Sequence, residues 1–189
     1  MMWFRWCYRI LACCLTPGLL IYVMLRAIRK PAYRDRWQER LGRCLPVDHA
    51  HPLIWIHAVS LGESKMVIML LEALKKTYPN YVFLLTSMTS SGSACQKKLE
   101  GDRVYHQYLP FDLWGCVAES FVDHYQPSIA IVVESDWWPG YLLALANRNI
   151  PLLIANMRIS PKSYRSYTKL KPVFKAYMSS VHRFCLQDQ

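Results

Sequence analysis

From Leu53 onward the chain alternates short apolar runs of β type with longer segments of helical periodicity. Such alternation calls for a mainly parallel sheet with helices on both faces, because each crossover between parallel strands needs a helix-sized connection. We expect strands at Leu53–His57, Tyr81–Thr86, Arg103–Tyr108, Ile129–Val133, Leu152–Ala155 and Arg183–Leu186. We expect helices at Ser64–Thr77, Ser91–Leu99, Leu113–Tyr125, Trp138–Asn147 and Tyr164–Ser180. The predicted class is α/β, with a Rossmann-like domain.

The first part of the chain has a different character. Between Arg9 and Arg26 lie 16 uncharged residues, interrupted by Thr16-Pro17-Gly18, which is expected to kink a helix. A retained membrane anchor is favoured over a cleaved signal peptide, because basic residues follow where a small-residue cleavage site would stand. The predicted organisation is 1–30 as anchor and basic flank, 31–52 as basic linker, and 53–189 as the Rossmann-like domain.

Positive charge is concentrated at the two ends of the chain. Residues 1–50 hold nine Lys/Arg and three Asp/Glu, residues 51–157 hold seven and nine, and residues 158–189 hold seven and one. A basic collar after an apolar segment favours a cytoplasmic orientation and contact with anionic headgroups, although a solvated helix face is an open alternative. Nucleic acid is the weaker choice of partner, since no zinc-finger, RNP or basic heptad pattern occurs.

Polar segments follow the predicted strands and should meet at one edge of a parallel sheet. They are Ala58–Glu63, Ser87–Gly92, Leu109–Asp112, Glu134–Gly140 and Asn156–Ser160. The seven cysteines and six histidines show no metal-binding or disulfide spacing, so the cysteines are interpreted as reduced thiols. No G-x-G-x-x-G, P-loop or G-x-S-x-G motif is present.

Glu63 and Glu134 are the two carboxylates at this edge that attract attention. Ser60 and Glu63 have the spacing of a helix capping box, but Glu63 beside Gly62 is equally suited to act as a general base. Glu134 follows an apolar run directly, so we expect it to be partly desolvated and useful in charge handling. Helix capping and pairing with Arg158 are structural alternatives for Glu134.

Read together, these motifs resemble the N-terminal half of the 3-deoxy-D-manno-octulosonic acid (Kdo) transferases of lipopolysaccharide synthesis. The matching segments occur in the family's order over nearly the whole chain, and they are Arg36–Gly42, His57–Glu63, Thr86–Gly92, Leu109–Asp112, Glu134–Pro139 and Asn156–Ser160. The chain departs from the usual pattern at Glu134-Ser-Asp, where the family has Glu-Thr-Glu, and at Asn156-Met-Arg, where it has Asn-Ala-Arg.

The resemblance implies an inverting GT-B glycosyltransferase, anchored in the cell inner membrane with its catalytic domain on the cytoplasmic side. It would transfer Kdo from CMP-Kdo to the lipid A precursor, with no cofactor or metal, and the donor-binding C-terminal domain is expected to be missing here. Glu63 would be the proton acceptor and Glu134 the transition-state stabiliser. The implied substrate-binding residues are Ser60, Gly62, Ser64, Thr89, Gly92, Asn156, Arg158, Ser160 and Lys162.

Two other function classes stay open from the sequence. A non-catalytic, membrane-associated remnant or module would bind phosphorylated lipid without needing the Glu63 carboxylate as a base. A nucleotide-binding Rossmann protein of unrelated chemistry is disfavoured by the missing glycine fingerprint.

Overall fold

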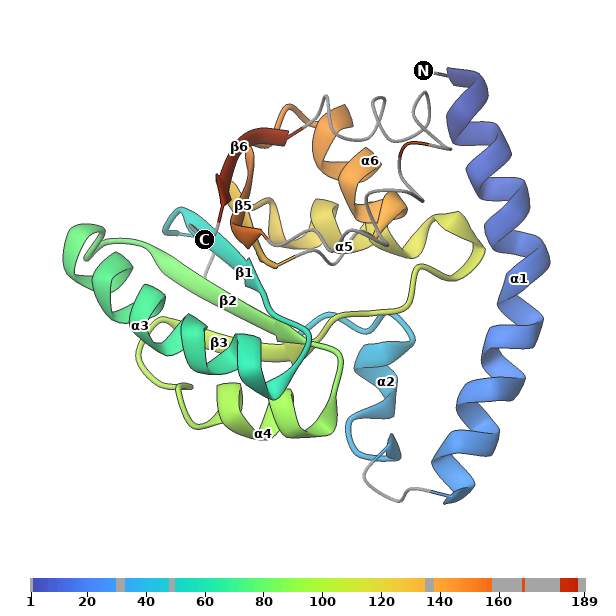
Figure 1. Cartoon of the computed structure of the whole chain (residues 1–189), viewed down its shortest axis with the longest axis horizontal. Helices are drawn as coiled ribbons and strands as arrows, with labels where there is room; N and C mark the ends of the chain where they lie inside the picture. Colours follow the sequence, from blue (N-terminus) through green and yellow to red (C-terminus); the bar gives the residue numbers. More distant parts are fainter. Residues whose placement is uncertain are drawn as a thin grey trace.

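The computed structural model describes residues 2–29, 33–47, 50–134, 138–157, 168 and 181–186. Its centre is a sheet of six strands with parallel neighbours in the order β3-β2-β1-β4-β5-β6. This is the order of a doubly wound Rossmann-like sheet, so the predicted fold class is confirmed (Figure 1). The strands are β1 (Leu53–His57), β2 (Val82–Ser87), β3 (Val104–Tyr108), β4 (Ile129–Val133), β5 (Leu152–Met157) and β6 (Val181–Leu186).

Helices cover both faces of the sheet, as the apolar runs require. On one face α3 (Leu61–Thr77) and α4 (Ser90–Lys97) follow the first two strands, and Ile54, Ile56 and Leu85 pack beneath α3. On the other face α5 (Val117–Tyr125) and α6 (Pro139–Asn147) cover Trp55 and Leu84. Successive residues of β1 therefore contribute to two separate cores, which is why that strand is apolar without alternation.

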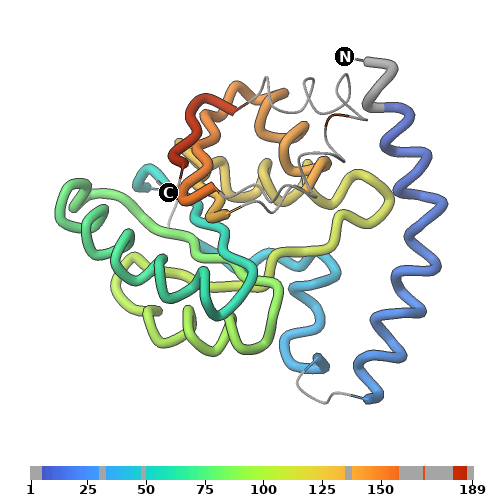
Figure 2. Tube along the Cα trace, in the orientation of Figure 1, coloured from blue at the N-terminus to red at the C-terminus, as the bar shows by residue number. Residues whose placement is uncertain are grey.

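The N-terminal segment forms one long helix, α1 (Met2–Arg29), along one side of the domain (Figures 1 and 2). The helix continues through Pro17, so the Thr16-Pro17-Gly18 segment does not end it, and the predicted kink stays a prediction. The Thr16 hydroxyl donates to the Ala12 carbonyl, one turn earlier, at 2.7 Å. In the described region, α1 packs mainly against the short 3₁₀ helix η2 (Leu113–Gly115).

The prediction of one helix over Leu113–Tyr125 is also wrong, because the segment is divided into η2 and α5. Trp114 and Gly115 have φ values of 58° and 65°, which no right-handed helix accommodates. A Cβ atom at Gly115 would lie 3.0 Å from the Cα of Arg9, so α1 approaches this turn as closely as a glycine allows. The predicted helix Tyr164–Ser180 lies outside the described residues, apart from Thr168.

The predicted basic collar after the apolar segment includes Arg36 and Arg40, and the side chains of these two arginines pack against the domain. Arg40, in the short helix α2 (Trp37–Arg40), has its guanidinium 3.7 Å from the ring centroid of Tyr108, while Arg36 lies over the same ring at 5.5 Å. Tyr33 is shared between Arg40 at 5.0 Å and Arg26 of α1 at 4.4 Å. A series of alternating arginine and tyrosine side chains therefore connects α1 with β3, and these arginines are not available as a fully solvated face.

Candidate functional site

The site is built where β1 and β2 end side by side. The Ala58 amide donates to the Thr86 carbonyl at 3.0 Å, which extends the ladder one residue beyond β1. The backbone amide and hydroxyl of Thr89 then both donate to the Val59 carbonyl, at 3.2 and 3.0 Å. The turns that follow β1 and β2 are thus joined to each other, as expected for parallel strands whose carboxyl ends share one edge.

Glu63 lies in the first turn of α3 and is 8% exposed. Its Oε2 accepts from the Val59 amide at 2.7 Å, and its Oε1 accepts from the Ser60 hydroxyl at 2.6 Å. The Ser60 oxygen in turn accepts from the Glu63 amide at 3.4 Å, which is the N-cap half of the predicted capping box. The other half differs, because the carboxylate accepts from the Val59 amide and the Ser60 hydroxyl instead of the Ser60 amide. A carboxylate has about four acceptor positions, and these contacts use two. Glu63 is therefore firmly oriented and retains capacity to accept a further proton donor.

Gly92, in the first turn of α4, is a packing glycine. A Cβ there would lie 3.0 Å from both the Val59 carbonyl oxygen and the Thr89 hydroxyl, and 3.2 Å from the Ser60 carbonyl carbon. The Gly92 amide donates to the Thr89 hydroxyl at 3.1 Å, which makes Thr89 the N-cap of α4. Because glycine has no side chain, the first turn of α4 can pack directly against the turn that carries Glu63.

Ser64 is 0% exposed and lies between the two helices. Its hydroxyl donates to the Ser60 carbonyl at 2.7 Å and receives the Gln96 amide at 3.0 Å. Gln96 also donates to the Ala58 carbonyl at 3.1 Å. Ser64 therefore acts from inside the protein, by holding the turn in place. Gln96 has the same role and was missed by the sequence reasoning; its place one helical turn after Gly92 is the signal that could have revealed it.

Gly62 contrasts with Gly92. It is exposed in the first turn of α3, and a Cβ there would meet nothing closer than the Ser60 hydroxyl at 3.8 Å. Protein packing does not require a glycine at this position. The space beside the Gly62 backbone, next to Glu63 in the chain, is therefore open.

Two residues at neighbouring strand ends have left-handed backbone conformations. Glu134 directly follows β4 and has a φ of 65°, and Asn156 is the residue before the last of β5 and has a φ of 55°. Glu134 is exposed, so the expectation that it is partly desolvated is wrong. Its amide donates to the Ala155 carbonyl at 2.8 Å, which ties it to the neighbouring strand end. Asn156 lies against Met66 of α3, one helical turn from Glu63. Backbone strain of this kind is concentrated at ligand sites.

Asp112 is not part of the open edge. One of its oxygens accepts from the Ala118 amide at the start of α5, at 3.0 Å, and the other accepts from the Tyr8 hydroxyl of α1 at 2.6 Å. Burial is the main reason that the pKa of the Asp112 carboxyl is raised. Asp112 therefore bonds to the first turn of α5 and to α1 at the same time.

The structure thus brings together five of the predicted substrate-binding residues, Ser60, Gly62, Ser64, Thr89 and Gly92, around Glu63. Arg158, Ser160 and Lys162, and the predicted pairing of Arg158 with Glu134, lie outside the described residues. Within the described part of the chain, no three His, Cys, Asp or Glu side chains are grouped to hold a metal ion. All seven cysteines are free thiols.

The doubly wound sheet, with an oriented carboxylate and hydroxyl groups at its carboxyl edge, defines a Rossmann-like α/β domain. Domains of this class bind ligands at the carboxyl ends of their strands. A family profile described as 3-deoxy-D-manno-octulosonic-acid transferase (kdotransferase) matches residues 35–189. This chain belongs to that family.

Similar curated proteins carry the same description. The chain is 35% identical to the 3-deoxy-D-manno-octulosonic acid transferase of Haemophilus influenzae, over 99% of this chain and 44% of the relative. It is 30% identical to a probable mitochondrial 3-deoxy-D-manno-octulosonic acid transferase of Arabidopsis thaliana, over 85% and 36%. The Chlamydia trachomatis enzyme of this name is 29% identical, over 83% and 37%. The chain therefore spans less than half the length of these relatives.

Proposed function

We propose that this chain is the acceptor-binding half of a Kdo transferase of lipopolysaccharide biosynthesis, with Glu63 as the general base. One observation carries the proposal. The Glu63 carboxylate is held by Val59 and Ser60 at the carboxyl edge of the central strand β1, beside the unobstructed backbone of Gly62. An oriented carboxylate next to open space suits an alcohol nucleophile.

In the proposed reaction, the primary hydroxyl of the distal glucosamine of the lipid A precursor attacks the anomeric carbon of Kdo in CMP-Kdo. The new carbon–oxygen bond forms as the bond to the CMP phosphate oxygen breaks, and CMP leaves as an anion. Glu63 accepts the hydroxyl proton. Attack opposite to the leaving group inverts the anomeric centre.

Glu134 is proposed to stabilise the transition state. A sugar that loses its leaving group develops positive charge at the anomeric carbon, and a nearby carboxylate stabilises such charge. The left-handed backbone of Glu134 supports this role, because it places an exposed carboxylate directly at the end of β4.

The acceptor is proposed to lie over the turns around Glu63, in contact with Ser60, Gly62, Thr89 and Asn156, while the buried Ser64 and Gly92 position these turns from beneath. Arg158, Ser160 and Lys162 are proposed to contact the acceptor phosphates. CMP-Kdo is expected to be held by a second domain of the GT-B kind, in the part of the relatives that this chain does not span. The location is proposed to be the cytoplasmic side of the cell inner membrane.

The discriminating experiment measures Kdo transfer from CMP-Kdo to a lipid A precursor in membranes containing this chain and the C-terminal half of the Haemophilus influenzae relative. Glu63→Gln is expected to reduce the rate about 10²- to 10⁴-fold. Glu72→Gln is the matched control, because Glu72 is an exposed carboxylate of the same helix.

The second candidate is a module that binds phosphorylated lipid without catalysis. The two hydrogen bonds between Ser60 and Glu63 favour this candidate, since they alone give Glu63 a structural use. Lipid A precursor binding without transfer in any combination, and equal binding by the parent and Glu63→Gln, would support this candidate and remove the base assignment.

A further inference from the structure

Helix α1 has two unlike sides. Residues Trp6–Arg29 have a mean hydropathy of 1.9 and are, by length and composition alone, sufficient for a membrane-crossing helix. One side of α1 packs on the domain, with Thr16, Val23 and Ala27 buried. The other side exposes large apolar side chains: Trp6, Ile10, Leu11, Leu15, Ile21, Tyr22, Met24, Leu25 and Ile28.

The packed side carries polar contacts along the helix. Near its beginning, Arg9 forms an ion pair of 2.6 Å with Glu119, and Tyr8 bonds to Asp112. Near its middle, the Thr16 hydroxyl accepts from the Trp114 amide at 3.0 Å. Near its end, the Ala27 carbonyl accepts from Arg34 at 3.0 Å.

These contacts extend from Tyr8 to Ala27, which corresponds to about 28 Å of α-helix. The hydrocarbon core of a bilayer is about 30 Å thick. A transmembrane α1 in this arrangement would therefore carry Asp112, Glu119 and the adjoining loop backbone into the hydrocarbon, where charged groups and irregular backbone exposed to lipid are strongly disfavoured.

The exposed side forms a straight apolar ridge. Ile10, Ile21 and Ile28 are spaced by 11 and 7 residues, so at 100° per residue they lie within about 20° of one line along the helix. Each is at least 60% exposed. The three isoleucine side chains therefore lie on the same side of the helix.

An exposed tryptophan, Trp114, lies on the domain directly beside α1. Its backbone is bonded to Thr16 and its side chain is 48% exposed, although a bulky residue with φ of 58° is disfavoured. Trp is the side chain most typical of the membrane–water boundary. Exposed Arg29 ends the helix, and exposed Arg34 and Arg43 follow it, with Asp35 as an exposed acid among them. This charge complements an anionic headgroup layer.

We propose that α1 does not cross the bilayer but lies in the plane of an anionic membrane surface, with its apolar ridge and Trp114 inserted together and the domain resting against the opposite side of the helix. This inference rests on the proposed membrane attachment and specifies its geometry. It does not depend on the transfer reaction.

The first test measures depth along the ridge. Ile10→Cys, Ile21→Cys and Ile28→Cys are made separately in the full chain with the native cysteines replaced, labelled with an environment-sensitive fluorophore, and bound to vesicles of phosphatidylethanolamine and phosphatidylglycerol. Nitroxide lipids quench from near the headgroup or from the acyl-chain end. An in-plane helix gives the same ratio of the two quenching efficiencies at all three positions.

A transmembrane helix gives a different pattern, because the label at Ile21 is then near the bilayer centre and those at Ile10 and Ile28 are near the two boundaries. That result would overturn the in-plane geometry and leave the attachment intact. Failure of the parent chain to bind vesicles would overturn both. Self-association in place of vesicle binding would assign the ridge to a second copy of the chain.

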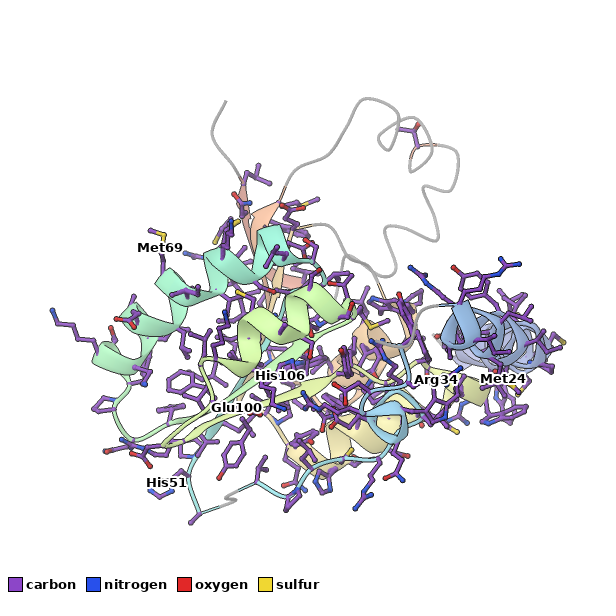
Figure 3. The ribbon with its side chains drawn as sticks, turned by 90° about the horizontal axis from the view of Figure 1, so that it is seen from below. Met24, Arg34, His51, Met69, Glu100 and His106 are labelled. Atoms are coloured by element: carbon purple, nitrogen blue, oxygen red, sulfur yellow. The ribbon has the colours of Figure 1, made fainter. Side chains whose placement is uncertain are left out.

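The second test compares two exposed methionines that lie at opposite ends of the molecule, Met24 on α1 and Met69 on α3 (Figure 3). Met24→Glu is expected to lower vesicle affinity about tenfold or more, as loss of one buried apolar side chain implies, whereas Met69→Glu leaves it unchanged. Trp114→Gly should also lower affinity, while the folded structure is retained because glycine accepts the left-handed backbone. Unchanged affinity in Trp114→Gly would remove Trp114 from the proposed surface.

Discussion

The guanidinium of Arg40 is stacked on the ring of Tyr108, 3.7 Å from its centroid, in the interior of the protein. Arg40 is 1% exposed, and its Nη1 donates to the Met88 carbonyl at 2.8 Å. Its Nε and Nη2 have no hydrogen-bond partner in the described structure. Burial lowers the pKa of this arginine, so the aromatic rings of Tyr108 and Tyr33 are important to its accommodation.

Truncation of Arg40 should reveal this packing. Arg40→Ala is expected to lower the free energy of unfolding by about 3 kcal/mol, because a large side chain is removed from a closed interior. Arg40→Met keeps a long side chain on Tyr108 and removes the desolvated charge, so it should lose less than half as much. Urea unfolding measures both. Equal losses would mean that the charge, rather than the stacking, is what the site needs.

His106 should make the protein sensitive to acid. Burial, with the nearby charges of Arg36 and Lys97, lowers the pKa of His106 to about 3. Between that pH and the ordinary value near 6.5, the unfolded chain binds a proton that the folded chain does not, so stability falls as the pH is lowered. The expected loss between pH 7 and pH 5 is about 2 kcal/mol, at about 1.4 kcal/mol per pH unit.

His106→Gln should remove this part of the pH dependence, because glutamine does not titrate. His51→Gln, at an exposed histidine, is the control and should leave the slope unchanged. Urea unfolding at the two pH values gives the comparison. A slope that persists in His106→Gln would assign the acid sensitivity to other groups.

Gly92 and Gly62 form a matched pair of glycines in the first turns of neighbouring helices. Gly92→Ala should destabilise the protein by about 1–3 kcal/mol, because its Cβ would press on the Val59 carbonyl and the Ser60 backbone. Gly62→Ala meets open space and should be neutral or stabilise by up to about 1 kcal/mol, since alanine favours a helix.

The same pair separates stability from binding. If acceptor approaches the backbone beside Glu63, Gly62→Ala should weaken binding of a lipid A precursor while it leaves or raises the melting temperature. Unaltered binding by Gly62→Ala would argue against a ligand at this position.

Ser60 is expected to affect both the helix and its carboxylate. Ser60→Ala removes the acceptor of the Glu63 amide and the donor to the Glu63 Oε1, so a loss of about 1 kcal/mol in unfolding free energy is expected. Ser60→Thr should restore most of it, because threonine also caps helices. Thermal unfolding of the parent and both variants tests this expectation. If Ser60→Thr does not recover the lost stability, helix capping is not the role of Ser60.

Much of the sheet could be predicted because its signals are local. β1 and β4 have the predicted bounds Leu53–His57 and Ile129–Val133. β2 is shifted by one residue at both ends, while β3 and β5 differ by one or two residues at one end. Apolar runs bounded by turn residues report such strands directly. The capping box at Ser60 and Glu63 is likewise encoded within four residues. Sequence alone therefore determined the fold class, the strand positions and the carboxylate at the edge.

Other features were decided by contacts between distant parts of the chain. Tyr8 and Asp112 are 104 residues apart, and no local pattern reports their bond. The helix predicted over Leu113–Tyr125 breaks at Trp114 because α1 lies directly on Gly115. Ser64, counted among ligand contacts from its motif, is enclosed by α4. Periodicity specifies which residues form a strand or helix, but burial, close approach and side-chain partners depend on which elements pack together, and only the tertiary structure decided those.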